Sequence, residues 1–569
     1  MLLRTRSPKR SWMALALLGV MAAAPGCAVD GNDLARWQTT QGGPKRLSAV
    51  VLHEKYPFPL RVEAALSLVA MKPRKGRHVG IERLVKGTLV CDPEYDDTEE
   101  PCQKRQLPVE ERAKLNADLV PALISELQKP PPAPTQNGQP APDPSFRYKD
   151  AAFLMLSYEG TEVIADRELR AQLEKALVDW AMADFETRLE DRNQAFGMEQ
   201  LLNLIGPPSV ERLPQLMTKE GRSLSKIADI IARIGSAKTK EQAGAALVEV
   251  AKRVASDAWR TEKASELKEA NRARGLEGIS EKSFQKQLER YQTETLIRVY
   301  ASMKKIGGPA VRDFGLEVAA DGKVDTAQRV AALAALEGHI GAEDEAAVSR
   351  LFALIEGDAP PQVKDKAFAR VRELPRDIVA GRLYKLVDGE DWLLRRVAGT
   401  TLLTLSKVEH IDEFFKELEG ARIENLHLDE SLKYGTYLGL LEGGDALAAL
   451  KPKMTSQNGV VSRLAALSYY YANGSKDDAA ALEPFARDPQ RIPECKGAEG
   501  EDCGWTCVVK EKDEKVRKTI ETIGDFVTHC IKPKMMTNEP ATDRPGTAPK
   551  PAGQPAGQPT GPGDKQDGK

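Results

Sequence analysis

The sequence has few of the residues that most often carry catalysis or bind metals. Histidine occurs only 6 times in 569 residues, and no two histidines form the His-Glu-x-x-His motif of zinc proteases. There is also no Gly-x-Ser-x-Gly nucleophile elbow, and no glycine-rich phosphate loop ending in Lys-Ser or Lys-Thr. We therefore expect no catalytic residue, no metal site and no cofactor, and we predict that the protein is not an enzyme.

Aromatic residues and blocks of one charge are also scarce. Phe, Trp and Tyr make up 5% of the chain, and basic residues do not gather in one stretch. Nucleic-acid binders concentrate Lys and Arg on one face, so we expect no nucleic-acid partner. Beyond residue 27 there is no run of about 18 apolar residues that could cross a membrane. The abundant Ala, Leu, Glu, Lys and Arg favour helix, and we predict an all-α fold.

The first 26 residues have the pattern of a secretory signal peptide. Four basic residues and no acid precede an apolar run from Trp12 to Ala24, which small residues follow. The run is shorter than the roughly 20 residues that a membrane span needs. Without these basic residues, the chain has 78 basic against 84 acidic residues. The sequence therefore predicts an exported protein of slightly negative net charge.

The segment Ala24-Pro25-Gly26-Cys27 resembles the lipobox of bacterial lipoproteins. It departs from that pattern at Pro25, and at Ala24 where leucine is usual. The resemblance implies a lipid (diacylglycerol and palmitate) on Cys27 that anchors the chain to the membrane. With Ala28 following, it also implies sorting to the periplasmic face of the outer membrane. The alternative is an ordinary secreted protein in which Cys27 is a free thiol.

Six cysteines follow Cys27, in two local groups: Cys91, Cys102, Cys495, Cys503, Cys507 and Cys530. An even number of cysteines in an exported chain predicts disulfides. Cys91 and Cys102 most simply pair with each other, and closing a loop of that size would stabilise the fold by about 3 kcal/mol. The acidic loop between them is expected to be solvated, with calcium binding as an alternative.

The four later cysteines allow two disulfides in three pairings. A zinc site is the competing interpretation, but no Cys-x-x-Cys knuckle is present. Val516, Ile520, Ile523, Val527 and Ile531 share one face if this region is helical. We therefore predict a disulfide-stapled helical cap over residues 490–534, which would cover the last apolar face of the array.

A short helical pattern recurs along the body of the chain. Its small residue falls at intervals of 30 to 37 residues, at Ala301, Ala331, Ala367, Ala398, Gly435 and Ala465. Such a period is typical of stacked helical hairpins, each of which cannot bury its apolar face alone.

The pattern resembles the second helix of a HEAT repeat, which carries an apolar residue, Arg or Lys, two free positions and Ala. The resemblance is clearest over residues 293–488 and weaker at 46–75 and 148–236. It implies an α-solenoid of HEAT-like hairpins. In such a fold we expect the small residues to lie in the seam between helices, the basic residue to stay at its edge, and Asp391 to cap a helix N-terminus.

The predicted organisation runs in nine parts. These are a signal peptide (1–26), a lipidated tether (27–45), N-terminal helical repeats with the Cys91–Cys102 loop (46–128), a proline-rich linker (129–147), helical repeats (148–239), a charged helical hairpin (240–292), HEAT-like repeats (293–489), the cysteine-rich cap (490–534) and a disordered tail (535–569).

We expect this solenoid to act as a lipid-anchored envelope scaffold that binds envelope proteins, whose identity the sequence does not give. One alternative is an enzyme or enzyme subunit whose site leaves no motif. Another is a polysaccharide binder, in which Trp259 and Trp392 would line one exposed groove. At least one of Tyr469, Tyr470 and Tyr471 is expected to be partly exposed, because consecutive helical residues point about 100° apart.

Overall fold

The computed structural model describes residues 29–74, 77–86, 108–130, 143–157, 163–190, 196–218, 220–275, 278–420, 426–493, 505–511 and 514–538. The predicted signal peptide, Cys27, the Cys91–Cys102 loop, most of the proline-rich linker and the tail beyond residue 538 lie outside these residues. The described chain is mostly helical and divides into two compact units, which meet in sequence near Leu213. None of the described helices is both long and apolar enough to cross a membrane.

The first unit is built from short helices. They are α1 (Gly31–Trp37), α2 (Gly43–Leu52), α3 (Phe58–Val69), α4 (Val79–Lys86), α5 (Val109–Leu127), α6 (Ser145–Ser157), α7 (Arg167–Ala183), α8 (Phe185–Glu190) and α9 (Met198–Ile205). Here α2 packs on α3, α3 on α5, and α5 on α7. The region expected to be a tether, residues 27–45, is thus already helical from Gly31. Asp30 caps α1 through the backbone N–H of Asp33, and Leu34 and Trp37 are buried, so this region forms part of the folded unit.

The second unit begins with α10 (Arg222–Ile234), which lies mostly within it. It continues with α11 (Ala237–Ala255), α12 (Asp257–Ala273), α13 (Glu281–Ile306), α14 (Pro309–Ala320), α15 (Thr326–Ala334), α16 (Glu345–Glu356), α17 (Pro361–Val371), α18 (Arg376–Val387), α19 (Trp392–Thr404), α20 (Ile411–Gly420), α21 (Leu428–Leu438), α22 (Ala446–Leu450), α23 (Val460–Leu467), α24 (Tyr469–Asn473) and α25 (Ala479–Leu482).

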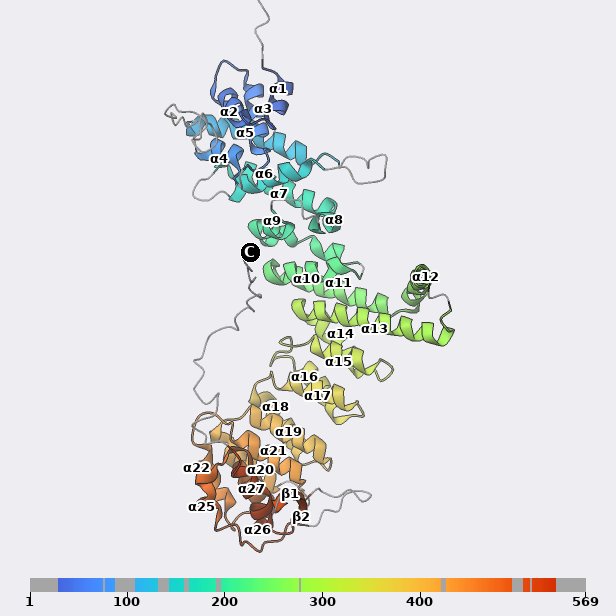
Figure 1. The fold of residues 1–569 in the computed structure, drawn as a ribbon, viewed down its shortest axis with the longest axis vertical. Coiled ribbons are helices and arrows are strands. Elements are labelled where there is room, and N and C mark those ends of the chain that lie inside the picture. Colours follow the sequence, from blue (N-terminus) through green and yellow to red (C-terminus); the bar gives the residue numbers. More distant parts are fainter. Residues whose placement is uncertain are drawn as a thin grey trace, which may run out of the picture. The chain divides into compact units, whose positions relative to one another are not determined.

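Helices of the second unit pack in a repeating order (Figure 1). Each of α13, α15, α17, α19 and α21 contacts the next in this series, and we call these five helices the row. Helices α14, α16 and α18 each pair with the row helix that follows them in the chain. A row helix such as α15 thus packs on α14, the helix before it in the chain, and on α17, the row helix of the next pair.

Small residues fill the seams of this packing, as predicted at three of the alanines. Ala367, Ala398 and Ala465 are fully buried, and a Cβ added at Gly435 would collide with the backbone of Ser468. Ala331 is only half-buried. The prediction is wrong at Ala301, which is exposed on α13 because Ser302, one position along, faces the neighbouring helices instead.

Asp391 caps α19 as predicted. Its carboxylate accepts hydrogen bonds from the backbone N–H groups of Leu393 and Leu394, at 2.9 and 3.2 Å. These N–H groups belong to the first helical turn and have no partner within the helix.

The C-terminal segment corrects the prediction of an all-α fold and of a helical cap. β1 (Thr506–Glu511) and β2 (Glu514–Thr519) form an antiparallel hairpin, followed by α26 (Ile523–Asp525), a π-helical turn (Phe526–Ile531) and α27 (Lys532–Met535). Val516 pairs with Val509 across this hairpin. It therefore does not share a helical face with Ile523 and Val527, because a strand alternates its side chains with a period of two.

Candidate partner-binding surface

In four helices that carry the recurring pattern the fourth residue is arginine, and we call these residues the fourth-position arginines: Arg61 in α3, Arg329 in α15, Arg395 in α19 and Arg463 in α23. None of the four is more than 9% exposed. Arg61 and Arg329 donate to a carbonyl in the last turn of the preceding helix, whereas Arg395 and Arg463 donate to carbonyls in the residues that follow the preceding helix. The acceptors are Val51 O for Arg61 (2.7 Å), Ala319 O for Arg329 (2.8 Å), Gly389 O and Glu390 O for Arg395 (3.1 and 2.9 Å) and Met454 O for Arg463 (3.0 Å).

The geometry of an antiparallel helix pair explains this recurrence. The last carbonyls of a helix lack partners within it and carry the negative end of its dipole. A side chain in the first turns of the next helix leans back toward its own N-terminus, and so toward those carbonyls. The expectation that the basic residue stays at the edge of the seam is therefore wrong. The arginine is buried because the end of the preceding helix, or the residues that follow it, supply carbonyl acceptors.

Arg395 also meets a buried carboxylate from the next row helix. Its Nε and Nη2 donate to the two oxygens of Glu430, at 3.2 and 3.0 Å, and Glu430 is fully buried. The Tyr434 hydroxyl lies 2.9 Å from both Glu430 Oε1 and Arg395 O, and donates its proton to one of them. Burial raises the pKa of the Glu430 carboxyl, against the opposing effect of Arg395 and Tyr434. The hydrogen bonds among Arg395, Glu430 and Tyr434 therefore link α19 to α21.

The predicted charged hairpin (240–292) corresponds in the structure to α12 and the first half of α13. The first residues of the predicted range belong to α11 instead. Figure 1 shows α12 and α13 extending beyond the ends of α11 and α14. Only two residues of α12, Trp259 and Asn271, are buried. Trp259 stacks on Tyr291 of α13, and Asn271 Nδ2 donates to Gln287 Oε1 at 3.0 Å.

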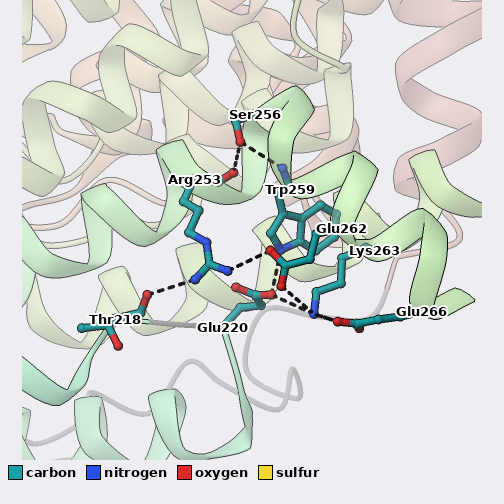
Figure 2. A network of polar contacts seen from close by, with 8 residues as sticks. All are labelled: Thr218, Glu220, Arg253, Ser256, Trp259, Glu262, Lys263 and Glu266. Atoms are coloured by element: carbon teal, nitrogen blue, oxygen red, sulfur yellow. Dashed lines mark hydrogen bonds and ion pairs between the residues drawn. The ribbon is translucent and has the colours of Figure 1, made fainter.

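A polar network fixes the base of this hairpin (Figure 2). The indole N–H of Trp259 donates to Glu220 Oε1 at 2.7 Å. Lys263 lies among three carboxylates, 2.9 Å from Glu266, 3.6 Å from Glu220 and 3.9 Å from Glu262. Burial lowers the pKa of Lys263, but these carboxylates raise it above its usual value overall.

Arg253 extends the network to α11. Its guanidinium pairs with Glu262 at 3.2 Å and donates to the carbonyl of Thr218 at 3.4 Å. The start of α12 is therefore held to α11 and to the segment before α10 by charge and hydrogen bonds as well as by its one buried aromatic side chain.

Neither tryptophan supports the polysaccharide alternative. Trp259 is 1% exposed, so it cannot line an open groove. Trp392 is half-buried, and the ring of His427 stacks on it at 3.7 Å between centroids. Of the three consecutive tyrosines, Tyr470 is buried while Tyr469 and Tyr471 are half-buried, which confirms that at least one is partly exposed.

Large apolar side chains are exposed at several places on the stacked helices. Ile297 on α13, Ile378 on α18 and Leu393 on α19 are 38%, 41% and 47% exposed, and Leu440, just after α21, is 67% exposed. They are spread singly over successive helix pairs. We take the row, on which Ile297 and Leu393 are exposed, as the candidate partner-binding surface.

Of the seven cysteines, the structure describes two. Cys507 in β1 and Cys530 in the π-helical turn form a disulfide with their Cα atoms 5.4 Å apart. This is one of the three pairings that the sequence left open, and it uses two of the four thiols that a zinc site would need. Cys27, Cys91, Cys102, Cys495 and Cys503 lie outside the described residues.

In the part of the chain that the structure describes, no group of three or more His, Cys, Asp or Glu side chains is placed to hold a metal ion. The sequence analysis placed the fourth-position arginines at the edge of the seam, whereas the structure buries them. The sequence does mark these residues, because all four belong to the recurring pattern.

Comparison with known proteins identifies no relative. No protein-family model matches the chain, and a search of curated proteins finds no match to it. What the structure establishes is a large, mostly helical protein with many packed helices.

Proposed function

We propose that this protein is a lipid-anchored scaffold of the bacterial envelope, which binds partner proteins along a HEAT-like α-solenoid and catalyses no reaction. The observation that carries the proposal is the row of α13, α15, α17, α19 and α21, in which each helix contacts the next. Repeated packing of this kind produces an extended surface, and extended surfaces of helical repeats are used for binding.

The fourth-position arginines support the repeat interpretation. Arg329, Arg395 and Arg463 perform one structural task in three helix pairs of the second unit. The Asp cap of α19 recurs at α15, where Asp325 accepts from the N–H of Ala327 at 2.8 Å. Recurrence of the same local solutions favours a repeated unit over a set of unrelated helices.

The enzyme alternative finds less support. An active site is favoured where carboxylates with strongly shifted pKa values gather in an accessible cleft. Glu430 is the described acid whose pKa burial raises, and it is 0% exposed and bonded to Arg395 and Tyr434. A substrate has no access to that carboxylate in this arrangement.

Site-specific photo-crosslinking in the native envelope tests the proposal. A photoreactive residue is placed at Ile297 or Leu393 on the row, and at Met536 in the C-terminal segment as a control, since Met536 is 58% exposed. We expect adducts of one defined mass from the row positions and none from Met536. Absence of adducts at every row position, or equal adducts at all three, would contradict a scaffold that binds along the row.

We also propose that a lipid on Cys27 holds the protein at the outer membrane, on its periplasmic face. This part rests on the resemblance of Ala24-Pro25-Gly26-Cys27 to a lipobox. The Cys27→Ser variant is expected to move from the membrane fraction to the soluble fraction, because one thiol carries the whole anchor. Fractionation and intact mass are the measurements, with Cys507→Ser, which opens the Cys507–Cys530 disulfide but keeps Cys27, as the control variant. Retention of Cys27→Ser in the membrane would exclude this anchor.

A further inference from the structure

A pocket of about 360 Å³ opens in the second unit where α14, α15 and α16 meet. Its walls include Arg329 of α15, Arg350 and Ala353 of α16, and Asp358 in the turn before α17. Arg329 is 6% exposed, so its charge is almost wholly removed from bulk water at the pocket wall.

Comparison with the other fourth-position arginines shows what Arg329 lacks. Arg61 pairs with Glu111 at 3.4 Å, Arg395 with Glu430 at 3.0 Å, and Arg463 with Asp488. Arg329 donates through Nε to Ala319 O, and within the described ranges it forms no ion pair and no further hydrogen bond. Three of these four guanidinium groups thus have a carboxylate supplied by the chain.

The position of the missing acid can be identified from the row. Glu430 is the third residue of α21, the row helix that follows α19. The third residue of α17, which follows α15 in the same way, is the fully buried Val363. In α17 an apolar side chain, Val363, therefore occupies the position at which α21 provides the acid Glu430. The guanidinium of Arg329 is left without an acidic partner, and the pocket lies beside it.

No other acid near Arg329 in the described chain takes over the role of the missing carboxylate. Asp325 is engaged as the cap of α15. Asp358 is exposed at the pocket wall, and neither it nor Arg350 has an ion-pair partner within 4.0 Å among the described residues. A buried charge without a counter-charge is costly, and a guanidinium binds a carboxylate through two parallel hydrogen bonds.

We infer that this pocket binds a carboxylate group, held by Arg329 with Arg350 as a second cation. The ligand supplies from the pocket side the counter-charge that Glu111, Glu430 and Asp488 supply to the other three arginines from within the chain. Its carboxylate comes either from a small organic acid or from an acidic side chain of a protein segment. This inference does not depend on the proposed scaffold function.

Isothermal titration of the purified full chain distinguishes these sources. One arm uses sodium succinate and the other the peptide acetyl-Gly-Glu-Gly-amide, with its Gln counterpart and sodium chloride as blanks at constant ionic strength. Binding of succinate alone assigns the site to a small organic acid, and binding of the Glu peptide assigns it to an acidic protein segment. Either result supports a carboxylate pocket.

Three variants connect the binding to the pocket. Arg329→Gln removes the proposed donor, and Ala353→Phe fills the pocket from an exposed position while keeping both arginines. Arg298→Gln makes the same charge change on the exposed side of α13. We expect binding at least about tenfold weaker in the first two variants and unchanged in the third. Absence of saturable binding to either probe, or binding that survives both pocket variants, would overturn the inference.

Discussion

Replacement of Glu430 by alanine is expected to lower the free energy of unfolding of the second unit by about 3 to 5 kcal/mol. Glu430 is fully buried, and its two oxygens accept from Arg395 at 3.2 and 3.0 Å. The variant leaves the guanidinium buried without its counter-charge and removes an acceptor of the Tyr434 hydroxyl. Chemical denaturation followed by circular dichroism measures the loss.

Two further variants separate the buried pair from ordinary surface charge. Asp429→Ala, next in sequence, removes the partner of Arg396 in a pair whose Asp429 side chain is 44% exposed, and should cost no more than about 1 kcal/mol. The double variant Arg395→Met with Glu430→Leu should recover most of the loss, because it leaves no unpaired buried charge. Equal losses for Glu430→Ala and Asp429→Ala would contradict the described burial.

Replacement of Trp259 by alanine is expected to release α12 from the rest of the second unit. Trp259 is 1% exposed, stacks on Tyr291 and donates to Glu220 at 2.7 Å. Truncating a buried tryptophan costs about 3 to 5 kcal/mol. Because α12 buries only one other residue, Asn271, we expect this cost to appear as local opening of α12.

Hydrogen exchange of peptides covering α12 measures that opening. A loss of 3 kcal/mol corresponds to about 150-fold faster exchange there. The control is Trp392→Ala, which removes a half-buried tryptophan from α19 and should leave α12 unchanged. Unaltered exchange in α12 of the Trp259→Ala variant would show that this side chain does not hold the helix.

Part of this architecture follows from the sequence because local rules decide it. The apolar period predicted helices over most of the body, and the Asp391 cap is where a short acidic side chain before a helix is expected. The small residues at Ala367, Ala398 and Ala465 mark helix seams because only a small side chain allows close approach.

Other features depended on tertiary contacts that a local pattern does not contain. The fourth-position arginines look like solvated edge residues in the sequence, and only the fold places carbonyls from the end of the preceding helix, or from the residues after it, beside them. The burial of Trp259 depends on Tyr291 and Glu220, 32 and 39 residues away. The unpaired state of Arg329 appears only by comparison with its three counterparts.

The C-terminal segment was mistaken for helix for a different reason. Ile523, Val527 and Ile531 do have helical spacing and are fully buried. Val516 and Ile520 extend that spacing by coincidence, because Val516 lies in β2 and faces Val509. A short segment with several apolar residues fits both the helical period of 3.6 and the strand period of two. Pairing with residues 506–511 makes residues 514–519 a strand.

The claim that the second unit is a stack of nearest-neighbour repeats is tested most directly by hydrogen exchange across the whole unit in the Glu430→Ala variant. In a stack each helix pair contacts only its neighbours, so a local loss of stability stays near its source. We predict much faster exchange in α18, α19 and α21 and wild-type exchange in α14 and α15. Equal acceleration from α11 to α27 would contradict the stack and indicate one cooperative globular core.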